Sequence, residues 1–319
     1  MTLSPSLRGT LFNRRNLSVS SIVNADDRLL RRHGWARNDV KILIALLVFL
    51  TGFAHAADLN VLLSSSAVLP GETLRVELDG ITPGAKVRVD FLGKRFPFYE
   101  VGPAAQRALI GIPLGTVPGS RTLKIHSVKG AANPIAEQDL QVMISTRVYE
   151  VENINLPPEK NVLATSEHNE SVRIHKIALQ STRDQYWEGA FQFPVEGPIE
   201  SPFGLKRTRN GTIDAGFHKG IDIKARDGAT LTAANAGVIV LAASFKAHGR
   251  VVMIDHGQGV MTIYLHMQKI GVRPGQKVAK GAVIGKVGSS GLATGPHVHW
   301  QVFVHSVPVN PIPWTEQEF

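Results

Sequence analysis

The chain of 319 residues has room for about two domains, and its composition, 43% hydrophobic and 19% charged, is that of a globular protein. It contains no cysteine, which excludes a disulfide framework, a thiolate metal site and a cysteine nucleophile. The net charge of +9 is concentrated at the start: residues 1–56 carry eight Lys and Arg against three Asp and Glu, which leaves +4 for the rest. No basic cluster interleaved with aromatic residues remains there, so we expect no nucleic-acid partner.

The N-terminal segment predicts export. Residues 42–53 form an apolar run, and Ala54-His55-Ala56 follows it with the small-x-small pattern that a signal peptidase accepts. Because the run is too short for a comfortable membrane span, we predict a leader and signal peptide over residues 1–56. The mature chain is then expected in the periplasm or cell envelope without a membrane span. An uncleaved anchor is the alternative, and the long leader suggests a translation start further downstream.

Residues 57–146 carry the pattern of a β domain. Leu74, Val76 and Leu78 alternate with polar residues, which is the period of a strand with one buried face. Pro-Gly turn signals separate several such runs. Short strands at this spacing predict an immunoglobulin-like β-sandwich. We expect its lone histidine, His126, to be exposed.

Residues 147–195 predict a connector with one helix. Ser166 is placed to cap a helix that runs to about Leu179. His168 and His175 fall on this helix without a pattern of acidic partners, so we expect both to be surface residues.

From residue 196 to 319, glycine-rich turns separate short strand patterns, which predicts a mostly antiparallel β domain with a groove. Histidines and one carboxylate recur there in three motifs: His218 and Asp222 in H-x3-D, His266 in Tyr264-Leu265-His266, and His297 and His299 in H-x-H. Side chains two apart on a strand share a face, so the last two can share a site. On a straight strand the H-x3-D pair would lie about 13 Å apart. The chain must therefore turn between them, and Gly220 is the residue that would permit this.

Two histidines and one carboxylate are the ligand set of a catalytic zinc site whose fourth position is open, and two histidines remain for proton transfer. With these motifs in this order, and with flanking segments such as 197–204 and 278–285, the sequence resembles the M23 family of zinc metallopeptidases, the lysostaphin or LytM type. The resemblance covers about residues 190–312. It implies that His218, Asp222 and His299 bind one Zn²⁺, that His266 and His297 are catalytic, and that the substrate is the peptide of bacterial peptidoglycan, cut at its cross-links or bridges.

Two other functions remain open. A catalytically inactive relative would bind the cell wall or activate another wall hydrolase, but such proteins typically lack one or more of the five site residues, all present here. A carrier domain is suggested by residues 275–285, which resemble a lipoyl or biotinyl hairpin, yet no convincing modifiable lysine accompanies them. In some relatives an upstream asparagine occludes the metal, a role open to Asn210. His248 and His305 are expected to be peripheral, and His256 to shape a turn.

Overall fold

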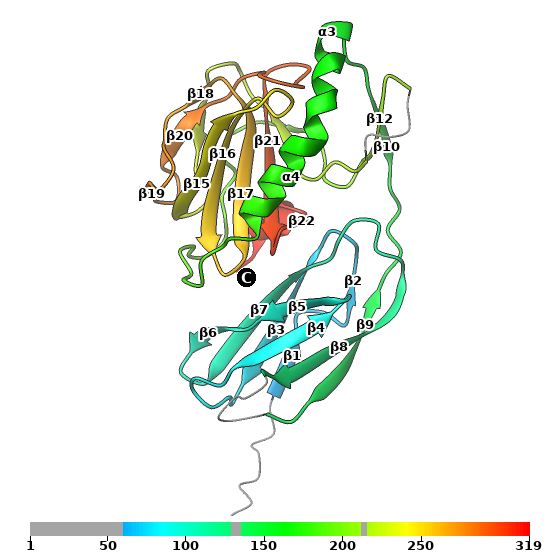
Figure 1. The fold of residues 1–319 in the computed structure, drawn as a ribbon, viewed down its shortest axis with the longest axis vertical. Coiled ribbons are helices and arrows are strands. Elements are labelled where there is room, and N and C mark those ends of the chain that lie inside the picture. Colours follow the sequence, from blue (N-terminus) through cyan, green and yellow to red (C-terminus); the bar gives the residue numbers. More distant parts are fainter. Residues whose placement is uncertain (1–59, 129–134, 212–215) are drawn as a thin grey trace, which may run out of the picture. The chain divides into compact units, whose positions relative to one another are not determined.

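The structure is a computed structural model that describes residues 60–128, 135–211 and 216–319 (Figure 1). The predicted leader and signal peptide lie outside the described residues. Within the described ranges, no helix is both long and apolar enough to cross a membrane. The protein is mainly β, as predicted.

Two sheets enclose the core of the N-terminal region. One has the strand order β1-β3-β7-β6 and the other β2-β9-β8-β4-β5, with only the β2–β9 pair parallel. The strands are β1 (Asn60–Leu63), β2 (Ala67–Val68), β3 (Thr73–Asp79), β4 (Val87–Phe91), β5 (Lys94–Pro97), β6 (Tyr99–Gly102), β7 (Ala105–Gly111), β8 (Gly119–Ser127) and β9 (Gln138–Ile144). Leu74, Val76 and Leu78 are fully buried between the sheets, as their alternation predicts. The immunoglobulin-like topology stays a prediction.

One expectation for this region is wrong. His126 is half-buried on β8, because its ring lies between the Arg88 and Asp90 side chains of the neighbouring strand β4, with Nε2 3.6 Å from Asp90 Oδ2.

The connector begins with strand β10 (Val151–Ile154) and continues into helical turns: α3 (Pro158–Asn161), the 3₁₀ helix η2 (Val162–Ser166) and α4 (Glu167–Ala178). The predicted helix is therefore present at the predicted place. Ser166 occupies the residue before α4 but makes no side-chain capping hydrogen bond. Its backbone is already helical (φ −89°, ψ −16°), because the helical turns begin nine residues earlier than predicted, at Pro158.

The C-terminal region is built on an eight-stranded sheet of order β11-β13-β21-β17-β16-β15-β19, with β22 pairing β21, and every pair in it is antiparallel, as predicted. A small sheet β14-β20-β18 and the parallel pair β10-β12 accompany it. The elements are β11 (Ile199–Ser201), β12 (Lys206–Arg209), β13 (Ile221–Lys224), β14 (Thr230–Thr232), β15 (Gly237–Ser244), β16 (Arg250–Gly257), β17 (Val260–Met267), β18 (Lys269–Ile270), β19 (Lys277–Val278), β20 (Val283–Lys286), β21 (His297–Val304), β22 (Val307–Val309) and α5 (Ile312–Glu316).

The central strands of this sheet are covered on both faces. Tyr264 and Trp300 belong to the main core on one face. Their neighbours Ile263 and Phe303 join a second cluster on the other face, where Ile174 of α4 packs. Figure 1 shows α4 running across these strands. The helix therefore closes the sheet from the side opposite the main core, and the strands that carry the predicted site are held from both sides.

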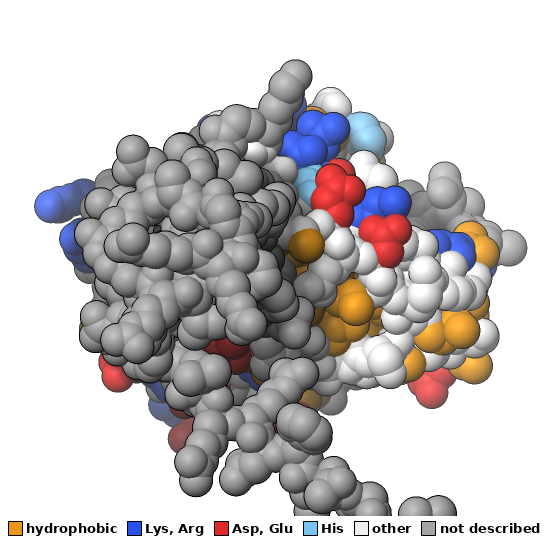
Figure 2. All heavy atoms as spheres, turned by 90° about the horizontal axis from the view of Figure 1, so that it is seen from below, with side chains coloured by type: hydrophobic (Ala, Val, Ile, Leu, Met, Phe, Trp, Pro, Cys, Tyr) orange, Lys and Arg blue, Asp and Glu red, His pale blue; other side chains and the backbone are white. Residues whose placement is uncertain are grey.

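Charged side chains of both signs share the surface. On the face shown in Figure 2, the described Lys and Arg side chains lie beside Asp and Glu side chains rather than in a patch of one sign. Lys124 and Asp139, for example, form an exposed ion pair at 3.1 Å on the strand pair β8–β9.

Candidate metal centre and active site

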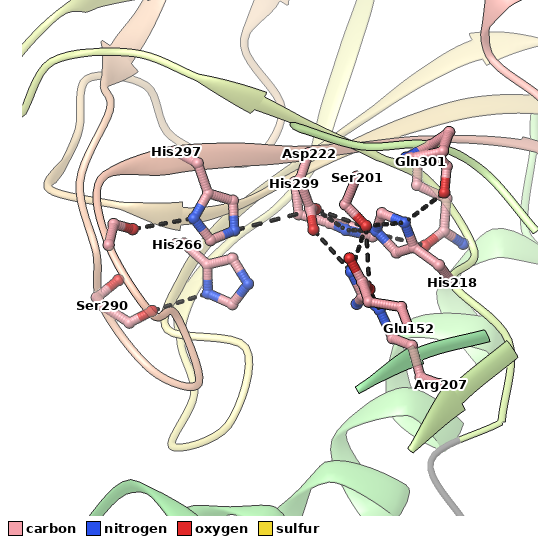
Figure 3. Close-up of polar contacts among 12 residues, drawn as sticks. Glu152, Ser201, Arg207, His218, Asp222, His266, Ser290, His297, His299 and Gln301 are labelled. Carbon is pink, nitrogen blue, oxygen red and sulfur yellow. Dashed lines mark hydrogen bonds and ion pairs between the residues drawn. The ribbon is translucent and has the colours of Figure 1, made fainter. Parts of the chain in front are cut away.

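Three of the predicted side chains converge on one point (Figure 3). The register of β13 and β21 places Asp222 directly opposite His299, and His218 reaches the same point from the segment before β13. Asp222 Oδ1 lies 3.0 Å from His218 Nε2 and 2.8 Å from His299 Nδ1, and the two ring nitrogens are 3.0 Å apart. Among the described residues, this is the group of His and acidic side chains whose ligand atoms lie close enough together to hold a metal ion.

Gly220 is needed at this site, but for a different reason from the one predicted. Its backbone is not in the left-handed region that favours glycine. A Cβ at this position would lie 2.8 Å from His299 Nε2 and closer still to the Trp300 carbonyl oxygen. Glycine is therefore required because the segment before β13 passes directly against β21, with no space for a side chain.

The hydrogen bonds of the two ligand histidines orient their free nitrogens. His218 Nδ1 lies 2.8 Å from the Pro202 carbonyl oxygen, which can only accept, so in the neutral ring Nδ1 carries the proton and Nε2 presents its lone pair to Asp222. His299 Nε2 faces Gln301 Oε1 at 3.4 Å, which leaves Nδ1 for the cluster. Lone pairs of two nitrogens and one carboxylate oxygen thus meet at one point. A cation satisfies such a set, and N and O ligands suit zinc.

The surroundings of this cluster set its protonation states. Burial alone would raise the pKa of Asp222, but its contacts with the His218 and His299 rings outweigh burial and hold the pKa well below the ordinary 3.8. Burial lowers the pKa of His299 to about 4, against the opposing effect of Asp222. An ionised carboxylate and a neutral imidazole are the protonation states that a metal ligand requires.

The two remaining predicted histidines lie beside this cluster, and each is fixed through Nδ1. His266 Nδ1 donates to the Ser290 carbonyl oxygen at 2.8 Å, and His297 Nδ1 donates to that of Gly295 at 2.9 Å. Their ring centroids are 5.0 Å apart, and His297 Nε2 is 3.9 Å from Asp222 Oδ1. Both rings therefore keep Nε2 free, and all five predicted residues meet in one site.

The backbone of His266 explains how it reaches the site. Regular alternation along β17 would point it to the same face as Tyr264, which is fully buried in the main core. His266 instead has φ of +61°, a left-handed conformation that is uncommon for histidine. This local twist turns the imidazole away from the core. Burial, together with the nearby charges of His297 and His299, lowers its pKa well below 6.5.

Comparisons with known proteins agree with this geometry. The model of "Peptidase family M23" matches residues 216–311. The peptidoglycan DD-endopeptidase ShyA of Vibrio cholerae is 39% identical over 124 residues, which are 38% of this chain and 29% of the relative. The DD-carboxypeptidase/endopeptidase Mpg of Neisseria meningitidis is 40% identical over 114 residues, 36% of this chain and 26% of the relative. A solved structure from Pseudomonas aeruginosa, provisionally assigned to peptidase M23, has 26% identity and a TM-score of 0.57, and the alignment covers 79% of this chain and 96% of that one.

Residues 216–311 of this chain match a peptidase M23 domain. The chain matches less than a third of the length of the two curated relatives. Strand β11, at Ile199–Ser201, precedes the matched residues and pairs with β13. We therefore keep 196–319 as the proposed extent of the M23 domain, with 57–146 and 147–195 as the proposed domain and connector before it.

Two cavities flank the proposed ligands of the M23 domain, and His266 lines both of them. One, of about 170 Å³, is walled by α4 through residues that include Ser171 and Ile174. The other, of about 160 Å³, lies on the side of Glu152 and His297. The groove itself stays a prediction.

Helix α4 also fixes a loop of the M23 domain, which the sequence did not indicate. The Glu170 carboxylate accepts hydrogen bonds from the backbone N–H groups of Lys246, Ala247 and His248, and His248 Nδ1 lies 2.8 Å from Glu170 Oε2. The His248 carbonyl oxygen in turn accepts from the His266 N–H at 3.2 Å. His248 is therefore not peripheral but belongs to the support of His266.

Two further histidines differ from expectation because of tertiary contacts. His256 does not lie in a turn: it is fully buried in β16, with Nε2 2.8 Å from Thr262 Oγ1. His305 does not join the ligand cluster, as expected, and its ring stacks on Tyr99. His175 is half-buried, with Nδ1 3.1 Å from the Ser306 carbonyl oxygen, whereas His168 is exposed as expected.

Asn210 does not reach the ligand cluster. Its Oδ1 accepts the Leu156 N–H at 2.8 Å, so in this structure the side chain ties β12 to the connector.

Proposed function

We propose that the chain is an exported, zinc-dependent endopeptidase that hydrolyses peptide cross-links or bridges of peptidoglycan. The observation that carries the proposal is the convergence of His218 Nε2, Asp222 Oδ1 and His299 Nδ1, with the Nε2 atoms of two further histidines beside them. The substrate class is supported by the names of the relatives, among them a peptidoglycan DD-endopeptidase of Vibrio cholerae. Export is supported by the signal-peptide pattern before residue 57.

The proposed roles follow from the free nitrogens. Zn²⁺ held by His218, Asp222 and His299 would supply Lewis acidity, which activates water and polarises the scissile carbonyl. His266 and His297 form backbone hydrogen bonds through Nδ1, so Nε2 is the atom that exchanges protons with the reacting groups. A neutral ring accepts the proton of the attacking water, and a protonated ring stabilises the oxyanion or protonates the leaving amine.

The test is digestion of purified peptidoglycan by residues 57–319, with and without a chelator, followed by identification of the products. We expect new amino termini that require zinc and that disappear in His299→Ala. Their absence with a zinc-loaded protein would reject the endopeptidase and favour the inactive module that binds the cell wall or activates another hydrolase. That alternative also expects His299→Ala to behave like the unaltered protein in cells.

A second measurement tests the division of the H-x-H motif. His299→Ala is expected to abolish tight zinc binding, because it removes one of three ligands. His297→Ala is expected to retain zinc and lose turnover, because His297 Nε2 lies 3.9 Å from Asp222 Oδ1, outside the ligand cluster. Equal loss of zinc in both variants would reject this division.

A further inference from the structure

The two oxygens of the Asp222 carboxylate have different partners. Oδ1 faces His218 and His299 in the ligand cluster, at 3.0 and 2.8 Å. Oδ2 accepts a hydrogen bond from Arg207 Nη2 at 2.8 Å. Arg207 therefore occupies the oxygen that a metal ion would need in order to bind Asp222 through both atoms.

Arg207 is itself held in place. Its Nε donates to Glu152 Oε2 at 2.8 Å, and its Nη2 donates to Ser201 Oγ at 3.0 Å. The parallel pairing of β10 and β12 sets Glu152 directly opposite Arg207, so their side chains share one face. Figure 3 shows the two side chains side by side below Asp222.

The same group of side chains also contacts a second proposed ligand, His218. Ser201 Oγ lies 3.1 Å from both Glu152 Oε2 and His218 Nδ1. Through these contacts, the three side chains support two of the proposed ligands, Asp222 and His218. Glu152, Arg207 and Ser201 all precede the residues matched by the family model. An ordinary surface ion pair contributes little to stability, because water and salt screen its charges. This pair differs because Asp222, the far end of the network, has only 13% of its side chain exposed.

We propose that Arg207, oriented by Glu152 of the connector, is a positioning residue that presents Asp222 to the metal through Oδ1 alone. This inference rests on the metal site of the proposed function. It makes the connector strand β10 part of the metal centre. Groups that orient ligands in this way typically change metal affinity 10- to 100-fold when they are removed.

Arg207 also carries a positive charge, which by itself repels a cation. The decisive protein is therefore the double variant Arg207→Gln/Glu152→Gln, in which the net charge is unchanged. The matched control is Arg209→Gln/Glu167→Gln. It removes the 2.7 Å ion pair between Arg209, on the same strand as Arg207, and Glu167 of α4, and this pair does not touch a proposed ligand. Zinc affinity is measured by competition with a coloured chelator, on residues 57–319 of each protein.

We expect zinc to bind about 10- to 100-fold more weakly to the Arg207→Gln/Glu152→Gln protein and within about twofold of normal to the control. The cobalt-substituted protein is expected to lose visible absorption, because a free Oδ2 raises the coordination number. Unchanged affinity and an unchanged cobalt spectrum in a folded double variant would overturn the inference. If that variant does not fold, the single variant Glu152→Gln decides. We expect it to lose less zinc affinity than the double variant, and an unchanged zinc affinity would overturn the inference.

The outcome is separable from that of the proposed function. A protein that binds zinc normally but leaves peptidoglycan uncut rejects the endopeptidase. The zinc affinities of the Arg207→Gln/Glu152→Gln protein and its control still test the role of Arg207 in that case. An unaltered protein that binds no zinc overturns both.

Discussion

The two β regions of this protein bury their strands differently. In the N-terminal sheets, strands such as β3 and β4 alternate buried with half-buried residues, because one face meets the core and the other meets solvent. Strand β7 is the exception, with six of its seven residues buried. In the M23 domain, all eight residues of β17 are buried, as are seven of the eight in β21. The difference arises because α4 of the connector covers the second face of the M23 sheet.

This difference teaches that the connector packs against the M23 sheet and covers its second face. A sheet with one face in solvent is complete by itself, whereas the M23 sheet requires the helix to cover apolar residues such as Met253 and Ile263. The same connector supplies Glu170 and Glu152 to the surroundings of the proposed active site. The connector therefore both covers the second face of the M23 sheet and supports the proposed active site.

The largest expected effect comes from breaking this cover. Ile174→Asp places a charge on the buried face of α4, at a side chain that is 4% exposed. It should lower the free energy of unfolding by about 3–5 kcal/mol, because the charge has no partner there. Val172→Asp, on the same helix at 40% exposure, is the control and should change it by less than about 0.5 kcal/mol. Denaturant unfolding measures both, and equal values would mean that α4 is not part of the core.

The next effect is a pH dependence specific to the M23 domain. Burial lowers the pKa of His256 from 6.5 to about 4, whereas the single histidine of the N-terminal sheets, His126, is only half-buried. Between these values the unfolded chain binds the extra proton and the folded one does not. Stability should therefore fall as the pH drops from 6.5 to 4, by up to about 3 kcal/mol.

The check is the difference in unfolding free energy between the unaltered protein and His256→Gln across this window. The difference should change with pH between 6.5 and 4 and stay constant above 6.5. A difference that stays constant throughout would contradict the lowered pKa of His256.

A smaller effect is expected from Glu170→Gln. The variant replaces a carboxylate oxygen that accepts N–H groups from residues 246–248 with an amide NH₂, which cannot accept them. We expect a loss of about 1–3 kcal/mol in unfolding free energy and a lower kcat, because the loop supports His266. Zinc affinity should be unchanged. Glu167→Gln, one turn earlier on α4, is the control, and a kcat as high as in that control would argue against the support role.

The smallest effect is expected on the exposed face of the N-terminal sheets. Asp139→Asn removes the ion pair with Lys124, in which both side chains are more than half exposed. The unfolding free energy should change by less than about 1 kcal/mol, and adding salt should reduce even this difference. A larger change would mean that these outer faces contribute more than their exposure indicates.

The sequence predicted what depends on local pattern. The five residues that the structure brings together could be predicted because each lies in a short motif, and the helix that ends near Leu179 could be predicted from the local residue pattern. Arg207 and Glu152 were missed because they are 55 residues apart and meet only through the parallel pair β10–β12. His256 and His248 were misjudged because burial and the Glu170 contact depend on distant segments.

At His266 the backbone and the proposed chemistry favour different amino acids. A left-handed φ of +61° costs a histidine about 1–2 kcal/mol, and glycine would adopt it freely. Selection for thermal stability alone would therefore tend to replace the imidazole, and selection for activity would keep it. At His266, stability and turnover are therefore opposed through a single backbone torsion angle.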